Sequence, residues 1–142
     1  MRRFCLVMWL MLLATLVGVA ETDKAAVARG QEVLVTLDEG NYADAYKAGA
    51  AMLQQATTAD SFAASLAAAH QAVGARKSRK FVKATHHNQL NGVTGDFYVL
   101  RFTSSYANLP KAAELLTLIR EDAKWKLAGY QIVKPEAVPA GL

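Results

Sequence analysis

The sequence predicts an α+β fold in which three N-terminal helices pack on a curved antiparallel sheet of about four strands. Apolar residues recur at helical spacing as far as Gly74, whereas β-branched and aromatic residues in alternation dominate from Arg76 onward. Turn residues interrupt the second half at intervals. Helices followed by strands must fold as two layers, so we expect a cone or an open roll.

Residues 1–20 have the pattern of an export signal. Arg2 and Arg3 precede an apolar run over residues 4–17, and small residues then lead to Ala20. The alternative is an uncleaved anchor, because the run approaches the length of about 17 residues that a spanning helix needs. We expect cleavage, a periplasmic or secreted protein, and no membrane span in the mature chain.

The mature segment, from residue 21 onward, lacks thiols. The only cysteine, Cys5, lies in the signal, so thiol nucleophiles, disulfides and thiolate metal sites are excluded. The formal net charge falls from +4 to +2, because the signal holds Arg2, Arg3 and no acidic residue. This charge gives no reason to expect a nucleic-acid partner. We expect one domain over residues 21–135 and a frayed tail over 136–142.

The first two helices are predicted over residues 26–37 and 41–53. Apolar or small side chains fall on one face of each, and the polar stretch 38–41 separates them. Asn41 is predicted to cap the second helix, and Asp44 favours its first turn.

The third helix is predicted to begin at Thr57 or Thr58 and to end before Gly74. Thr57 and Asp60 have the spacing of a capping box. A glycine after the last apolar position is typical of a helix C-terminus.

Four strands are predicted over residues 78–87, 96–107, 111–121 and 125–133. The turn after the first contains Asn91-Gly92, which favours a hairpin. The segment 111–121 is ambiguous, because its Ala, Leu and Glu content favours a helix while its place between strands favours a strand. We predict a strand there.

Five landmarks occur in a familiar order along the chain: LDEGNYA at 37–43, VGAR at 73–76, YVLRFTSSY at 98–106, Glu114, and WKLAGYQI at 125–132. Together they resemble the bacterial exported family called domain of unknown function 4019, over roughly residues 25–133. The chain departs from the family at Tyr46, where a tryptophan is expected, and at Ala123, where a turn glycine is more typical.

The resemblance implies a cone of the nuclear-transport-factor-2-like or cystatin-like class. That class holds enzymes, binding modules and subunit-contact domains, so the fold does not define the function. The family has no assigned activity, and the resemblance therefore supplies no catalytic residues.

The hollow side of such a sheet is the default place for a ligand. We expect the second helix and the inward strand positions to line it with aromatic side chains, namely Tyr42, Tyr46, Tyr98, Phe102, Tyr106 and Tyr130. The alternative is that these rings form the core, because aromatic side chains dominate burial in a small domain.

Glu114 is the best candidate for acid–base chemistry, with Tyr98 or Tyr130 as hydroxyl donors. If Tyr106 pairs with Lys111, however, Arg101 lies one diagonal from Glu114, and an ion pair between them is as natural.

A basic run provides a candidate surface for anionic partners: Arg76, Lys77, Arg79, Lys80 and Lys83. The alternative is a solvated strand edge that lysine protects from aggregation. The adjacent His86 and His87 point to opposite faces of a strand, so we expect no metal site.

Serine-triad, P-loop and dinucleotide motifs are absent from the sequence, and we expect no cofactor. The leading hypothesis is a non-catalytic module of the cell envelope that binds a small apolar ligand or an envelope protein. One alternative is a small isomerase-, dehydratase- or hydrolase-like enzyme that uses Glu114 and a tyrosine. Another is a dimerising accessory domain, which would make the protein a homodimer.

Overall fold

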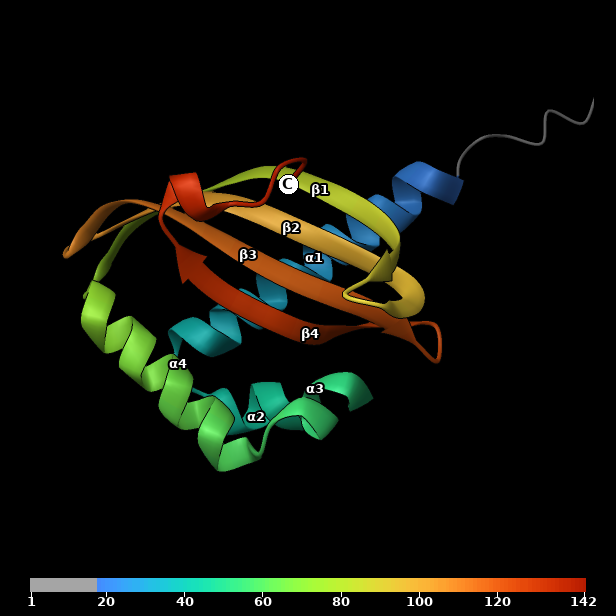
Figure 1. The fold of residues 1–142 in the computed structure, drawn as a ribbon, viewed down its shortest axis with the longest axis horizontal. Helices are drawn as coiled ribbons and strands as arrows, with labels where there is room; N and C mark the ends of the chain where they lie inside the picture. The colour runs from blue at the N-terminus through green and yellow to red at the C-terminus, as the bar shows by residue number, and fades with distance from the viewer. Residues whose placement is uncertain (1–17) are drawn as a thin grey trace, which may run out of the picture.

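The computed structural model describes residues 18–142, and the predicted signal lies outside them except for residues 18–20. The fold is α+β, with N-terminal helices packed on a four-stranded antiparallel sheet, as predicted (Figure 1). The elements are α1 (Gly18–Asp38), α2 (Tyr42–Lys47), α3 (Ala51–Ala56), α4 (Ala59–Val73), β1 (Arg76–Leu90), β2 (Val93–Tyr106), β3 (Leu109–Glu121) and β4 (Lys124–Val133). A short 3-10 turn, Pro135–Ala137, follows.

The sheet is a meander in the order β1-β2-β3-β4. The ambiguous segment 111–121 is a strand, as predicted, because β3 has a ladder partner on each side. Asn91 and Gly92 make the first hairpin turn with positive φ angles of 50° and 79°. In the last turn Asp122 and Ala123 have φ of 49° and 63°, a conformation that favours glycine.

The predicted helix 41–53 is wrong as one element, because the chain turns at Gly49 and Ala50 into the separate helices α2 and α3. Ala50 is fully buried, and its N–H donates to the carbonyl of Leu127 at 2.8 Å. A side chain on Gly49 would meet the carbonyl of Tyr46 at 3.0 Å. The break between α2 and α3 therefore lets the chain bind β4. Helical spacing in the sequence cannot reveal such a tertiary contact.

Two predicted helix caps differ in the structure. The Asn41 side chain makes no cap hydrogen bond to α2, and its amide donates to Glu39 at 3.2 Å. Thr58 caps α4 by accepting from the N–H of Ser61 at 3.1 Å, and Thr57 does not take part. The start of α4 is therefore fixed by Thr58, the second of the two predicted positions.

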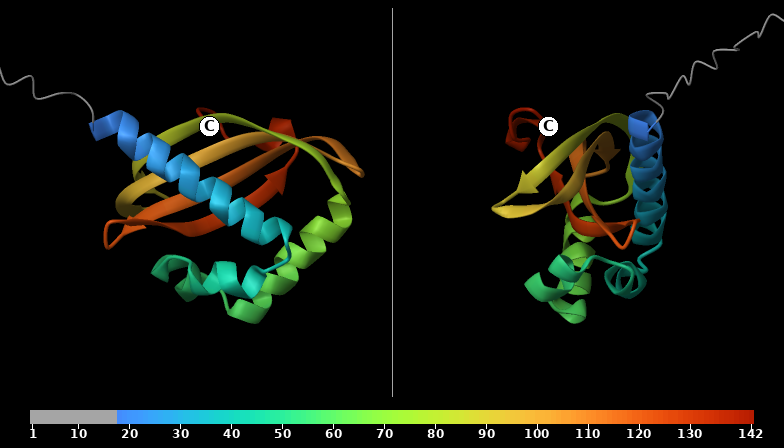
Figure 2. Two further views of the ribbon diagram at one scale, coloured as in Figure 1. Left: turned by 180° about the vertical axis from the view of Figure 1, so that it is seen from behind. Right: turned by 90° about the vertical axis from the view of Figure 1, so that its right-hand side faces the viewer.

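Helix α1 runs diagonally across one face of the curved sheet (Figure 2). It approaches closely at Gly30, where an added side chain would meet Leu100 at 2.2 Å. Helix α2 packs on α1 and α4, while α3 contacts β4. The helices thus cover the concave face and one border of the sheet.

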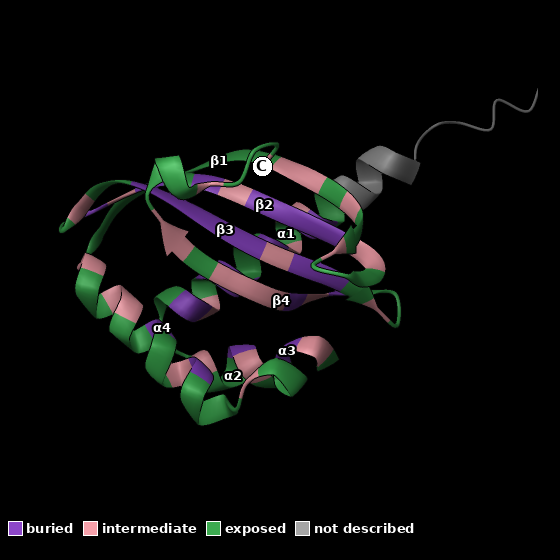
Figure 3. Cartoon of the chain, in the orientation of Figure 1, coloured by how far each residue is buried: buried purple, intermediate pink, exposed green. Residues whose placement is uncertain are grey.

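Most of the core lies between α1 and the two central strands, which are largely buried in Figure 3. Leu34, Leu37, Leu100 and Leu116 are among its fully buried side chains. Burial of this apolar face is what holds the two layers together.

The end of the chain lies against the opposite face of the sheet. Arg101 donates to the carbonyl of Leu142 at 2.7 Å, and Lys83 donates to that of Gly141 at 3.0 Å. Within residues 18–142, no helix combines the length and the hydropathy needed to cross a membrane.

Candidate functional site

Glu114 lies at the centre of the helix-facing side of the sheet and is fully buried. Arg79 of β1 holds its carboxylate in a fork, with Nε 2.8 Å from Oε1 and Nη2 2.9 Å from Oε2. The hydroxyl of Ser104 donates to Oε1, and that of Tyr130 donates to Oε2. Four donors therefore satisfy one buried carboxylate, as a buried charge requires.

Arg79 also connects Glu114 to Asp38, the last residue of α1. Its Nη1 and Nη2 donate to the two oxygens of Asp38 at 2.7 and 2.9 Å. Arg76 adds a third contact to Asp38, at 3.1 Å. A continuous chain of charges thus runs from the interior, through Arg79, to the surface at Asp38.

The predicted ion pair between Glu114 and Arg101 is wrong. Glu114 pairs with Phe102 across the ladder, and Tyr106 pairs with Leu109 rather than Lys111. This register places Glu114 on the helix-facing side, whereas Arg101 faces the other side and contacts the end of the chain.

The network keeps Glu114 ionised. Burial alone would raise the pKa of Glu114, but the hydrogen bonds from Arg79, Ser104 and Tyr130 outweigh it and lower that pKa. Burial and the Glu114 charge raise the pKa of Tyr130. A carboxylate that stays charged and has its acceptors occupied is poorly suited to move protons near neutral pH.

The six predicted pocket aromatics lie in four settings. Tyr98, Phe102 and Tyr106 are buried in the core, and Tyr130 binds Glu114. Tyr46 is half-buried, and its hydroxyl donates to the carbonyl of Thr57 at 2.7 Å.

Tyr106 faces the same carboxylate. Its hydroxyl is buried and makes no hydrogen bond of ordinary geometry within residues 18–142. Burial and the nearby Glu114 charge raise the pKa of Tyr106 to about 12. Its phenol therefore stays neutral.

Tyr42, the sixth aromatic, lines a surface hollow of about 380 Å³. We call it the mouth hollow; its wall consists of Asp38, Glu39, Gly40, Tyr42, His70, Gly74, Ala75 and Arg76. The hydroxyl of Tyr42 lies 2.7 Å from Nδ1 of His70. The charged chain from Glu114 therefore reaches solvent at a hollow that also presents an imidazole and a phenol.

His70 is neutral at physiological pH. Burial lowers its pKa, and this effect exceeds the opposing influence of the Asp38 and Glu114 charges. From the sequence, His70 is considered only as a helix residue that could approach a metal bound by His86 or His87, an arrangement that we do not expect to form. Its role at the mouth hollow depends on α2 and α4 packing together, which no local motif reports.

The basic run does not form one uniform surface. Arg79 points inward to Glu114, and Arg76 is paired with Asp38. Lys77 and Lys80 are exposed on the border strand. No group of histidine, cysteine or acidic side chains suited to a metal occurs in the part of the chain that the structure describes.

The molecule is thus an α+β domain whose sheet interior is closed by a buried, fully paired carboxylate. The family model described as Protein of unknown function (DUF4019) matches residues 29–130, and the chain belongs to this family. No curated protein matches the chain. The nuclear-transport-factor-2-like relationship stays a prediction.

Proposed function

We propose that the protein is a non-catalytic binding module of the cell envelope that takes a small polar ligand in the mouth hollow. Export rests on the signal pattern of residues 1–20. The observation that carries the binding role is the meeting of Tyr42, His70, Asp38 and Arg76 around one hollow of about 380 Å³. These groups offer both donors and acceptors to a ligand.

The residues that line the mouth hollow favour a polar ligand, whereas the sequence predicts an apolar one. An apolar ligand was expected because six aromatic side chains were predicted to surround it. Three of them, Tyr98, Phe102 and Tyr106, are instead at most 4% exposed within the core. The mouth hollow has charged and hydroxyl-bearing walls, so a polar ligand suits it better.

The enzyme alternative has one favourable feature, because Tyr130 does donate to Glu114 as that hypothesis requires. The same carboxylate is held by Arg79 and Ser104, and its pKa is lowered rather than raised. A general acid in an apolar site needs the opposite shift. The geometry therefore favours binding over catalysis.

The direct test is native mass spectrometry of the protein purified from its own envelope. We expect an added small mass in the wild type, and its loss in the double variant with Tyr42→Phe and His70→Ala. Lys111→Ala, a change at an exposed residue that lines neither hollow, should retain it. An absent added mass, or one that the double variant keeps, contradicts the proposal.

The same spectra address two further expectations from the sequence. A co-purifying chain would identify an envelope protein as the partner instead of a small ligand. A doubled protein mass would support the homodimer.

A further inference from the structure

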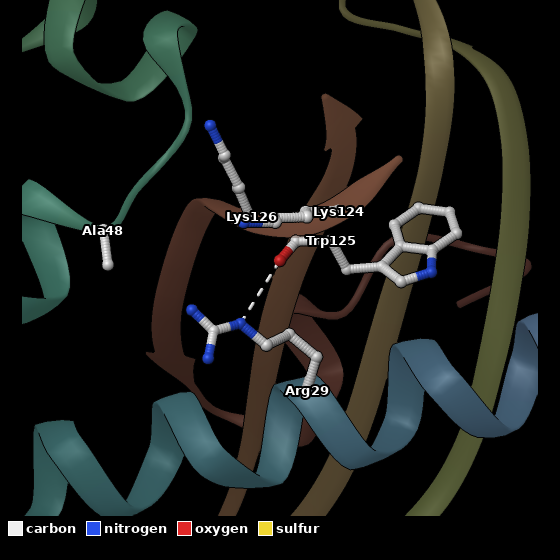
Figure 4. A pocket seen from close by; sticks show the side chains of 5 residues that line it. All are labelled: Arg29, Ala48, Lys124, Trp125 and Lys126. Carbon is white, nitrogen blue, oxygen red and sulfur yellow. Dashed lines mark hydrogen bonds between the residues drawn. The ribbon is translucent and has the colours of Figure 1, made fainter. Parts of the chain in front are cut away.

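A second hollow, of about 490 Å³, lies where α1 passes the start of β4 (Figure 4). We call it the cationic hollow; it is lined by Arg29, Ala48, Lys124, Trp125 and Lys126. It shares no lining residue with the mouth hollow. Binding in the cationic hollow can therefore be tested separately from the proposed function.

Arg29 is held in place by two acceptors. Its Nε donates to the carbonyl of Trp125 at 3.2 Å, and its Nη1 donates to Glu32 at 2.9 Å. Figure 4 shows the guanidinium end and the Lys126 amine extending to the side on which Ala48 lies. An arginine fixed at Nε and Nη1 keeps Nη2 for a further acceptor.

The two lysines come from one side of a strand. Lys124 and Lys126 are two positions apart on β4, so their side chains leave the same face. Lys126 is 3.6 Å from Glu121, whose two oxygens also accept from the N–H of Ala51 at 3.2 and 3.1 Å. Lys124 is exposed and has no ion pair within residues 18–142.

Two of the acidic groups nearby are already engaged. Glu32 is committed to Arg29, and Glu121 to Lys126 and the start of α3. Asp44 lines a smaller adjoining hollow, of about 190 Å³, rather than the cationic hollow. The groups left to meet a ligand are the free donors of Arg29 and Lys124.

From this arrangement we infer that the cationic hollow binds a phosphate group. A planar guanidinium with a free N–H, beside primary amines, matches the acceptor oxygens of phosphate. The group could come from a free phosphorylated molecule or from a lipid headgroup, and both supply the same oxygens.

The test is a titration of the full chain with inorganic phosphate at constant ionic strength, followed by NMR. We expect saturable shifts at the Arg29 Nε–H and at the amides of residues 124–126. Lys124→Ala should raise Kd about tenfold. The loss of one charge-assisted hydrogen bond weakens binding by at least about this factor. Arg29→Lys, which keeps the charge but loses the fork, should also weaken binding.

Matched controls identify the site. Lys111→Ala removes one exposed lysine elsewhere on the sheet and should leave Kd unchanged. Tyr42→Phe, at the mouth hollow, should also leave it unchanged, so this test can succeed or fail separately from the proposed function.

Vesicles distinguish the two sources. Flotation with phosphatidylcholine vesicles that contain phosphatidic acid, abolished by Lys124→Ala and absent with pure phosphatidylcholine, would assign the headgroup as the source. Saturable binding of inorganic phosphate without flotation would assign a free phosphorylated molecule. The inference is overturned if neither probe binds, or if Lys124→Ala binds both as well as Lys111→Ala does.

Discussion

Arg79 reaches past β2 to grip Glu114 on β3, and its Nε and Nη2 lie 2.8 and 2.9 Å from the two carboxylate oxygens. Because Arg79 also holds Asp38, one side chain joins the end of α1 to two strands that are not neighbours. Asp38, which Arg79 holds, is in turn a wall residue of the mouth hollow.

Loss of Arg79 should destabilise the protein strongly. Arg79→Met leaves the Glu114 charge buried without its counter-ion, and we expect the free energy of unfolding to fall by about 3–5 kcal/mol. Urea denaturation followed by circular dichroism measures it. Lys80→Met, the same change at the exposed neighbour, should cost less than about 0.5 kcal/mol.

The double variant Arg79→Met, Glu114→Met separates the ion pair from simple loss of packing. Removing both charges should recover much of the stability lost in Arg79→Met, because no unpaired charge then remains buried. Equal or greater destabilisation in the double variant would show that the unpaired Glu114 charge is not the cause of the loss in Arg79→Met.

Acid should destabilise the protein through Glu114. Its pKa in the folded state is lowered from 4.5, so the stabilisation is complete above that value and is lost as the pH falls toward the lower folded-state pKa. Denaturation curves between neutral pH and acid should show this loss. In Glu114→Gln the unfolding free energy should depend less on pH in the acid range. An unchanged pH dependence would contradict a stabilising pair between Glu114 and Arg79.

The sequence predicted the layers better than the site. Alternation in β2 correctly placed Tyr98, Leu100 and Phe102 on one face, because the period of a strand depends only on local order. The partner of Glu114 depends on register, and a slip of one residue reverses the face of a side chain. The turn that sets this register is fixed by Asn108, whose N–H donates to the carbonyl of Val73 at 2.8 Å.

The last turn of the sheet offers a stabilising change. Ala123 has a φ of 63°, which costs an L-residue about 1–2 kcal/mol. Ala123→Gly should therefore raise the unfolding free energy by up to about 1 kcal/mol, as measured by thermal denaturation. Ala107→Gly, at an exposed turn alanine without a positive φ, should instead lower it slightly.

The cap of α4 gives a pairwise test. Thr58→Ala removes the acceptor for the Ser61 N–H and should cost about 0.5–2 kcal/mol. Thr57→Ala should cost less, because its hydroxyl makes only a 3.5 Å contact to the carbonyl of Thr58. Chemical denaturation measures the loss of unfolding free energy in each variant. Equal losses would indicate that Thr57 also caps α4.

The most direct measurement is an NMR titration of the Glu114 side-chain carboxyl in the folded protein. A network that keeps this group ionised predicts a midpoint below 4.5, with the Glu114 signal broadening only as the protein unfolds in acid. A midpoint raised toward neutral pH would mean that the buried carboxyl holds a proton there. The closed interior would then be an acid–base site, and the binding account would be contradicted.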